Sequence, residues 1–244
     1  MEPLTTPHLF RDARQIRALS PGVYSALRES ESAAAYDRKA AIYDAVVGWP
    51  PYHRIVWGTS AARYGEFARS ALAAAGGDPF AEIGCGSLLF TAEMYREART
   101  GTTLVSDRSL EMLRRAAKRL ASHAHDRSAR PIILHADAVS LPLVSSMFSS
   151  VLMLNLLHVP IDRAAIIAEC GRLLIPREGR LFATCLVKTG RWSDAAMHFL
   201  HRAGELGAPL TRDEALGMMI GDWGLIESCE VEGNMTFVVV RHGD

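Results

Sequence analysis

The fold of this 244-residue chain is decided by the stretch Phe80-Ala81-Glu82-Ile83-Gly84-Cys85-Gly86-Ser87. Its first four residues form a short apolar run that predicts a buried strand, and two glycines follow. Glycine lets the backbone turn sharply and lie close to a ligand, and free N–H groups at the start of a following helix attract polar or anionic groups. The stretch therefore predicts a strand, a glycine loop and a helix that form one side of a nucleotide site.

The glycine loop differs from the one that binds dinucleotides. The G-x-G-x-x-G pattern requires a third glycine at position 89, where this chain has Leu89. An acid, Glu82, comes just before the glycines, so we expect its carboxylate at the carboxyl end of the strand, facing the crevice. A nicotinamide-dependent oxidoreductase is the alternative that this pattern disfavours.

From residue 76 onwards the chain alternates between apolar runs and amphipathic segments. Strands that are buried on both faces of a sheet appear as nearly continuous apolar runs, so this alternation predicts a parallel sheet covered by helices. A tight turn at Gly233-Asn234 joins the last two strands. The expected strands are residues 79–83, 102–106, 131–135, 151–156, 180–187, 225–231 and 235–241, and the expected helices are residues 88–99, 110–123, 163–174 and 212–219.

Residues 1–75 have a different composition, rich in alanine and helical in pattern. Two proline-containing stretches, Ser20-Pro21-Gly22 and Trp49-Pro50-Pro51, end helices rather than continue them. We therefore expect residues 1–75 to form an N-terminal helical cap or lid in two or three pieces. Residues 76–244 then form the nucleotide-binding domain, and the two parts make one compact unit.

Composition excludes several classes of function. Lys plus Arg equals Asp plus Glu at 27 each, so no net charge draws the chain to nucleic acid or to an anionic surface. The basic residues from Arg114 to Arg119 alternate with apolar ones, as on the solvated face of a helix. No signal peptide or membrane span is expected, which makes the protein cytoplasmic by default. The chain has four cysteines, which are Cys85, Cys170, Cys185 and Cys229. They lie far apart and lack metal-ligand spacing, so they predict neither a zinc site nor disulfides.

Acids also stand at the ends of the next two expected strands. Asp107 follows residues 102–106, and a carboxylate there can accept both hydroxyls of a ribose. Asp137 follows residues 131–135, where a carboxylate can accept from an exocyclic amine. Either acid alone is also explained as a helix cap or turn residue. Together with Glu82, the acids predict a site shaped for a nucleoside.

With these motifs in view, residues 36–187 resemble the class I S-adenosylmethionine-dependent methyltransferases, in particular the small-molecule branch of the ubiquinone/menaquinone-biosynthesis type. The chain departs from the family at Leu88, where a third glycine is usual, and at Ser106, where a glycine is common before the ribose acid. Residues 176–179 are a loosened form of the usual Pro-Gly-Gly turn. The resemblance rests on Tyr36-Asp37, Tyr43-Asp44, EIGCGS at 82–87, SDRSLEML at 106–113, ADAVSLP at 136–142, MFSSVLMLNLLHV at 147–159 and RLLIPREGRL at 172–181.

The resemblance implies a role for each matching position. The loop Gly84-Cys85-Gly86 would line the methionine and ribose parts of S-adenosylmethionine, and Asp107 would hold the ribose hydroxyls. The remaining cofactor contacts would be Arg108 and Met112 beside the adenine, Asp137 and Ala138 at its edge, and Asn155 at the methyl-donor end.

Substrate and catalytic residues are less constrained by sequence. His158, after the fourth strand, is the candidate general base or acceptor-orienting group; a structural histidine at the start of a loop is the alternative. His198, with His201, falls in an insert that often forms the outer wall of the pocket; a solvent-exposed histidine pair is the alternative. The expected lid contacts are Tyr36, Tyr43, His53 and Trp57, for which core packing is the alternative.

The sequence thus predicts a three-layer α/β Rossmann-like fold, with a mostly parallel seven-strand sheet, an antiparallel last strand and a helical cap. The resemblance implies methyl transfer from S-adenosylmethionine, with S-adenosylhomocysteine as product. We expect a small organic acceptor, no metal, no nucleic acid, and a monomer or homodimer. The alternatives are a catalytically silent cofactor-binding protein, which Leu88 suggests, and an enzyme that uses the bound sulfonium for a non-methyl reaction.

Overall fold

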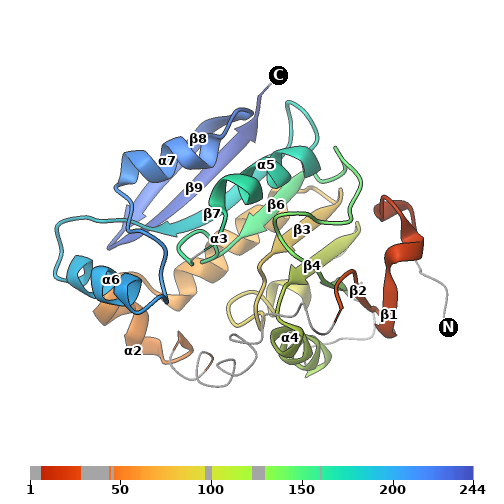
Figure 1. Cartoon of the computed structure of the whole chain (residues 1–244), viewed down its shortest axis with the longest axis horizontal. Coiled ribbons are helices and arrows are strands. Elements are labelled where there is room, and N and C mark those ends of the chain that lie inside the picture. Colours follow the sequence, from red (N-terminus) through yellow and green to blue (C-terminus); the bar gives the residue numbers. More distant parts are fainter. Residues whose placement is uncertain are drawn as a thin grey trace.

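A computed structural model describes residues 7–28, 44, 47–96, 101–122, 130–159 and 161–243. These residues form a three-layer α/β structure in which one twisted sheet lies between two layers of helices (Figure 1). Within the described part of the chain the sheet has nine strands, in the order β1-β2-β5-β4-β3-β6-β7-β9-β8. The predicted α/β fold is confirmed, but the predicted count of seven strands is wrong.

The centre of the sheet is parallel and its far side is antiparallel. Strands β2, β5, β4, β3, β6 and β7 pair in parallel, whereas β9 is antiparallel to both β7 and β8. The strands are β1 (Arg17–Ser20), β2 (Val23–Ser25), β3 (Phe80–Ile83), β4 (Thr103–Asp107), β5 (Ile132–His135), β6 (Ser150–Met153), β7 (Arg180–Leu186), β8 (Gly224–Glu232) and β9 (Met235–His242).

Side chains alternate between the two faces of the sheet and so divide the core in two. In β3, Ala81 and Ile83 pack with α5 (Arg163–Leu173) and α7 (Arg212–Ile220), while Phe80 packs with α3 (Ala61–Ala74) and α4 (Leu110–Ser122). Because both faces are covered, the central strands are buried along their whole length.

Local signals in the sequence explain where the longer helices begin. The side chains of Ser60 and Asp162 accept hydrogen bonds from the first turns of α3 and α5. Thr211 and Glu214 form a capping box at the start of α7. Helix α6 (Ser193–Arg202) lies in the insert after β7, and the segment before α3 contains α2 (Pro50–Tyr52) and η4 (His53–Trp57).

The first described residues are not helical as predicted. After two short 3-10 turns, η1 (Pro7–Leu9) and η2 (Ala13–Gln15), strands β1 and β2 form a hairpin on the free edge of β5. Pro21 and Gly22 make its turn, with Gly22 at φ +75°. We interpreted this pair as the end of a helix, but proline followed by glycine at positive φ equally suits the two central positions of a tight turn.

A second correction concerns residues 88–99, for which a helix was predicted. The described part of this segment consists of successive turns and the short 3-10 helix η5 (Met94–Arg96). Leu88 has φ +57° and is only 1% exposed, so the chain enters the segment in a left-handed conformation that an α-helix does not continue.

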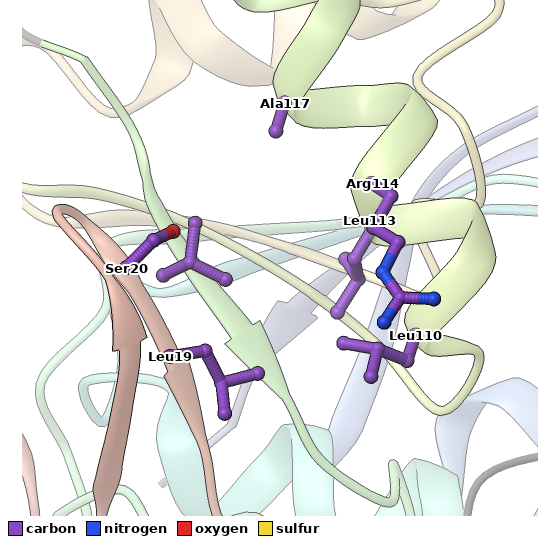
Figure 2. Close-up of a pocket in the computed structure, with 7 residues that line it drawn as sticks. Leu19, Ser20, Leu110, Leu113, Arg114 and Ala117 are labelled. Atoms are coloured by element: carbon purple, nitrogen blue, oxygen red, sulfur yellow. The ribbon is translucent and has the colours of Figure 1, made fainter.

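A hollow of about 380 Å³ lies between the N-terminal hairpin and α4. In Figure 2, Leu19 and Ser20 of the hairpin lie opposite Leu110 and Leu113 of the helix. The hairpin is therefore attached mainly at β5 and less along α4. Among the described residues, no helix has the length and apolar character needed to cross a bilayer.

Candidate functional site

The glycine loop follows β3, at the edge of the sheet where the parallel strands end. Gly84 and Gly86 have φ of +67° and +54°, a conformation that favours glycine. A Cβ on Gly84 would lie 2.8 Å from Cδ2 of Leu156, whereas one on Gly86 would meet nothing within 4 Å. The loop is therefore packed closely at its first glycine and open to a ligand at its second.

Asp107, at the end of β4, holds this loop in place. Its Oδ2 accepts the N–H of Gly86 at 2.8 Å, and its Oδ1 accepts the N–H of Ser109 at 2.8 Å. Each carboxylate oxygen has about two acceptor positions, so these bonds use one position on each oxygen. The residue predicted to hold ribose hydroxyls thus also organises the backbone on which the ligand would lie.

Glu82 is buried in β3 rather than facing an open crevice. It is 2% exposed, and its oxygens accept from Thr91 Oγ1 at 3.0 Å and from Tyr95 Oη at 2.6 Å. Burial raises the pKa of Glu82 to about 7; the two hydrogen bonds oppose this rise and the nearby Asp107 charge adds to it. Its carboxyl group therefore holds the turns after the glycine loop in place through Thr91 and Tyr95.

Cys85, between the two glycines, is also buried. Burial raises the pKa of its thiol well above the ordinary value, and the charges of Asp107 and Glu82 raise it further. The thiol is neutral at pH 7, so Cys85 contributes shape to the loop and no nucleophile.

The residues predicted for the adenine lie around the ends of β4 and β5. Arg108 Nη1 is 3.3 Å from Asp137 Oδ2, and Asp137 Oδ1 accepts the N–H of Val139 at 3.2 Å. Ala138 is half-buried beside them, whereas Met112 is buried in α4 with 4% of its surface exposed. Asp137, which is predicted to bind the edge of the adenine, is thus paired with Arg108, which is predicted to lie beside the adenine.

On the other side of the glycine loop, the segment after β6 carries Asn155 and His158. Asn155 has φ +57°, and its N–H donates to Thr184 Oγ1 of β7 at 2.9 Å. His158 Nδ1 is buried without a hydrogen-bond partner among the described residues. Burial and the neighbouring Arg163 lower the pKa of His158 to about 4, so its ring is neutral at pH 7.

The residues predicted as lid contacts have different positions. His53 is buried and packs its ring against Tyr52, Tyr64 and Phe90, with Nε2 3.0 Å from the carbonyl oxygen of Val47. Trp57 is buried in the same core. His198 is exposed on α6. Two further candidates, Tyr36 and Tyr43, lie outside the described residues.

The sequence did not reveal that Asp44, Ser87 and Arg119 form one network at this site. Asp44 Oδ1 accepts from Ser87 Oγ at 2.6 Å, while the Arg119 guanidinium donates to Asp44 Oδ2 at 2.9 Å and to the Ser87 carbonyl at 2.6 Å. Arg115 is also 3.7 Å from Asp44. Both arginines, predicted to lie on the solvated face of a helix, are partly exposed and also contact Asp44. The sequence around Asp44 gave no indication that this acid would contact Ser87 and Arg119.

Comparison with known proteins agrees with this geometry. The sequence family described as a methyltransferase domain matches residues 80–177. This span contains the glycine loop, the three strand-end acids, Asn155 and His158. No curated protein sequence matches the chain.

Solved structures extend the methyltransferase fold over most of the chain. The [4+2]-cyclase SpnF has 17% sequence identity and a TM-score of 0.67, covering 86% of this chain and 94% of its own. The methyltransferase solved in complex with the Haloferax volcanii activator Trm112 has 15% identity and a TM-score of 0.61, with coverages of 86% and 98%. Geranyl diphosphate C-methyltransferase from Streptomyces coelicolor A3(2), solved with S-adenosylhomocysteine, has 13% identity and a TM-score of 0.56, with both coverages 74%.

Proposed function

We propose that the protein binds S-adenosylmethionine and transfers its methyl group to a small organic acceptor. The observation that carries the proposal is the junction of Gly86 and Asp107, where one carboxylate fixes the backbone of an open glycine loop at the end of two adjacent parallel strands. Ligands of open α/β sheets bind at this edge. The methyltransferase domain across residues 80–177 supports the same cofactor.

The residues around this junction fit such a nucleoside. Asp107 would accept the ribose hydroxyls, and Gly84 to Gly86 would lie along the methionine part. Asp137 would accept from the adenine amine, which requires its contact with Arg108 to loosen or to be shared. Met112 and Ala138 would form apolar walls of the adenine pocket.

Bound S-adenosylmethionine supplies an activated methyl group, whose bond to sulfur breaks as the bond to the acceptor forms, leaving S-adenosylhomocysteine. The protein then mainly has to align the acceptor and exclude water. Asn155 and His158 lie where the acceptor would approach, and exposed His198 with buried His53 and Trp57 stand on elements that would surround it. A pKa of about 4 makes His158 a weak base at pH 7, so we propose that it orients an acceptor through a hydrogen bond.

Isothermal titration calorimetry with S-adenosylhomocysteine tests the cofactor site. Replacing Asp107 removes charge-assisted hydrogen bonds worth about 1.5–3 kcal/mol each, so Asp107→Ala should weaken binding at least tenfold. Asp222→Ala, in an exposed turn after α7, is the matched control and should bind like the wild type. Absence of binding to the unmodified protein would overturn the proposal.

A second candidate is a reaction that uses the cofactor fold without methyl transfer. The structural likeness to a [4+2]-cyclase shows that this fold also carries cyclisation chemistry. Incubation with methyl-labelled S-adenosylmethionine and extracts containing small organic acceptors separates the two. A labelled product together with a stoichiometric amount of S-adenosylhomocysteine supports methyl transfer. Conversion of an acceptor that yields neither a labelled product nor S-adenosylhomocysteine supports the second candidate. Cofactor binding with no conversion would support a catalytically silent protein.

A further inference from the structure

Helix α6 has one face packed on the protein and one face in solvent. Ser193 and Met197, one turn apart, are buried, whereas Trp192 and Phe199 are 60% and 72% exposed. At about 3.6 residues per turn, Trp192, Ala195 and Phe199 fall on the same side of the helix, roughly opposite Ser193 and Met197. We call these three residues the α6 stripe. It is an apolar stripe that points away from the core.

The first turn of α6 is held in this orientation by a buried hydrogen-bond network. Ser193 Oγ donates to Asn234 Oδ1 at 2.6 Å, and Asn234 Nδ2 donates to Asp194 Oδ1 at 2.7 Å. Ser193 and Asn234 are both fully buried. Rotating the helix to turn Trp192 toward the core would break these bonds and leave buried polar groups unsatisfied. The exposure of the α6 stripe is therefore imposed by the fold.

The segment beside this turn also exposes apolar side chains. A Cβ on Gly58 would lie 3.1 Å from Arg191 Nη2, and the N–H of Asn234 donates to the Trp57 carbonyl at 2.8 Å. The end of η4 thus adjoins the start of α6, in the part of the molecule where Figure 1 shows α2 and α6. Ile55 of η4 is 57% exposed. The described residues have three exposed aromatic side chains, all in these two segments: Trp49, Trp192 and Phe199.

Exposed cations accompany these apolar side chains. Arg202 follows Phe199 by one turn on the same side of α6, Arg191 directly precedes the helix, and Arg54 belongs to η4. Residues 47–60 and 191–202 contain these three arginines and one acid, Asp194. The carboxylate of Asp194 is occupied by hydrogen bonds from the preceding loop and from Asn234. The chain as a whole has no net charge, but this surface is positive.

The size and composition of the α6 stripe favour a lipid surface over a second copy of the chain. Aromatic side chains have about 150–250 Å² each to bury, so Trp192 and Phe199 offer roughly 300 Å² at most, whereas a stable dimer buries about 800 Å² on each partner. Tryptophan is enriched at the boundary between lipid and water, and arginine is attracted to anionic headgroups. The stripe therefore suits shallow insertion into an anionic membrane surface, which needs no membrane-spanning helix.

We propose that α6 docks the protein on an anionic lipid bilayer, with Trp192 and Phe199 inserted among the headgroups and Arg191 and Arg202 against their negative charges. The docking does not rest on the proposed function. It can be measured on the full chain without S-adenosylmethionine or an acceptor.

Co-sedimentation with lipid vesicles tests the docking. We expect the wild type to bind vesicles that contain about a third phosphatidylglycerol at least tenfold more tightly than vesicles of phosphatidylcholine alone, because each arginine near an anionic surface contributes about a factor of five. Added salt should weaken the binding to the anionic vesicles. Absence of binding to the anionic vesicles, or equal binding to the two lipid compositions, would overturn the proposal.

Variants assign the binding to the α6 stripe. Trp192→Ser and Phe199→Ser should each bind anionic vesicles at least fivefold more weakly, because each removes an inserted ring. Arg202→Gln should bind them about fivefold more weakly. Leu225→Ser is the matched control, since Leu225 is 53% exposed but lies on β8, and it should bind like the wild type. Unchanged binding in both serine variants of α6, or an equal loss in Leu225→Ser, contradicts the assignment.

Two further measurements locate the contact and test for self-association. The difference between the fluorescence spectra of the wild type and Trp192→Phe gives the signal of Trp192, which should shift to shorter wavelength when anionic vesicles are added. A Trp192 signal that does not shift would rule out its insertion. In sedimentation velocity without lipid, the wild type and Trp192→Ser should have the same association state. A wild-type dimer that Trp192→Ser dissociates would assign the stripe to contact between copies and overturn the proposal.

Discussion

Glu82 makes the stability of the protein depend on pH. Its pKa is about 7 in the folded protein and ordinarily about 4.5, so between these values the folded state holds a proton that the unfolded state has lost. The stabilisation by this proton is complete below about pH 4.5 and disappears as pH rises through 7. We expect Glu82→Gln to remove this loss, which amounts to about 3 kcal/mol at most.

Urea unfolding at pH 5 and pH 8 measures the effect. The wild type should lose more stability than Glu82→Gln between the two pH values. Glu93→Gln is a suitable control, because Glu93 is exposed in the same segment. Parallel pH profiles for the wild type and Glu82→Gln would show that the carboxyl group is already ionised at pH 5.

At Leu88, favourable packing of the side chain is opposed by strain in the backbone. The side chain is buried in the core beneath α3 and α4, but the backbone at φ +57° is one that glycine adopts more easily. Truncation to alanine removes the packing and keeps the strain, while truncation to glycine removes both. We therefore expect Leu88→Gly to be about 1 kcal/mol less destabilising than Leu88→Ala, the reverse of the usual order.

Chemical denaturation of both variants gives this difference directly. Leu88→Ala should lose about 2–5 kcal/mol, as for other buried leucines. A larger loss for glycine than for alanine would mean that the left-handed conformation costs little here.

At this scale the sequence predicted that Asp107 ends a strand, but it placed Glu82 facing a crevice, whereas the structure buries it in β3. The sequence indicated no partner for either acid. That Tyr95 and Thr91 would turn back onto Glu82 depends on the non-helical path after Leu88, which no periodicity encodes. Nothing in the sequence indicated a contact between His135 and Ser25, because the two residues are 110 positions apart.

Helix α4 is tied to the glycine loop by one of its arginines. The Arg119 guanidinium contacts both the Ser87 carbonyl and Asp44, and only a planar fork with several donors makes both contacts at once. Arg119→Lys keeps the charge but gives up one of these bonds. We expect it to weaken S-adenosylhomocysteine binding about three- to tenfold in calorimetry, while the melting temperature falls by only a few degrees.

The same helix provides the control. Arg114 is two-thirds exposed and forms an ion pair with Glu111 on the same helix. Arg114→Lys should therefore bind the ligand like the wild type. If both lysine variants bind equally well, the network with Asp44 does not shape the glycine loop.

Elements with strong periodicity were predicted well, and those decided by tertiary contacts were not. The helix at residues 110–123 and the strands that became β4, β5 and β7 were placed within one or two residues. The hairpin was missed because three residues of β2 carry too little pattern, and because its partner β5 is about 110 residues away. Pairing with an existing sheet edge, rather than local preference, makes these residues a strand.

The whole sheet now has two different edges. On one side β8 ends the sheet with exposed acids, of which Glu227 and Glu230 pair with Arg180 and Arg63. On the other side β1 ends it, and β2 covers β5, whose four residues are all buried. Charged side chains protect an exposed edge from pairing with another chain, whereas a bare apolar edge invites it.

Removing the hairpin should therefore change the association state of the molecule. Without residues 1–28, the edge of β5 loses the backbone bonds that join Gly22 to Ile133 and Ala26 to His135. We expect the shortened chain to form larger assemblies than the full chain at the same concentration, as measured by sedimentation velocity. An unchanged sedimentation coefficient distribution, apart from the lost mass, would mean that β5 is protected by something other than the hairpin.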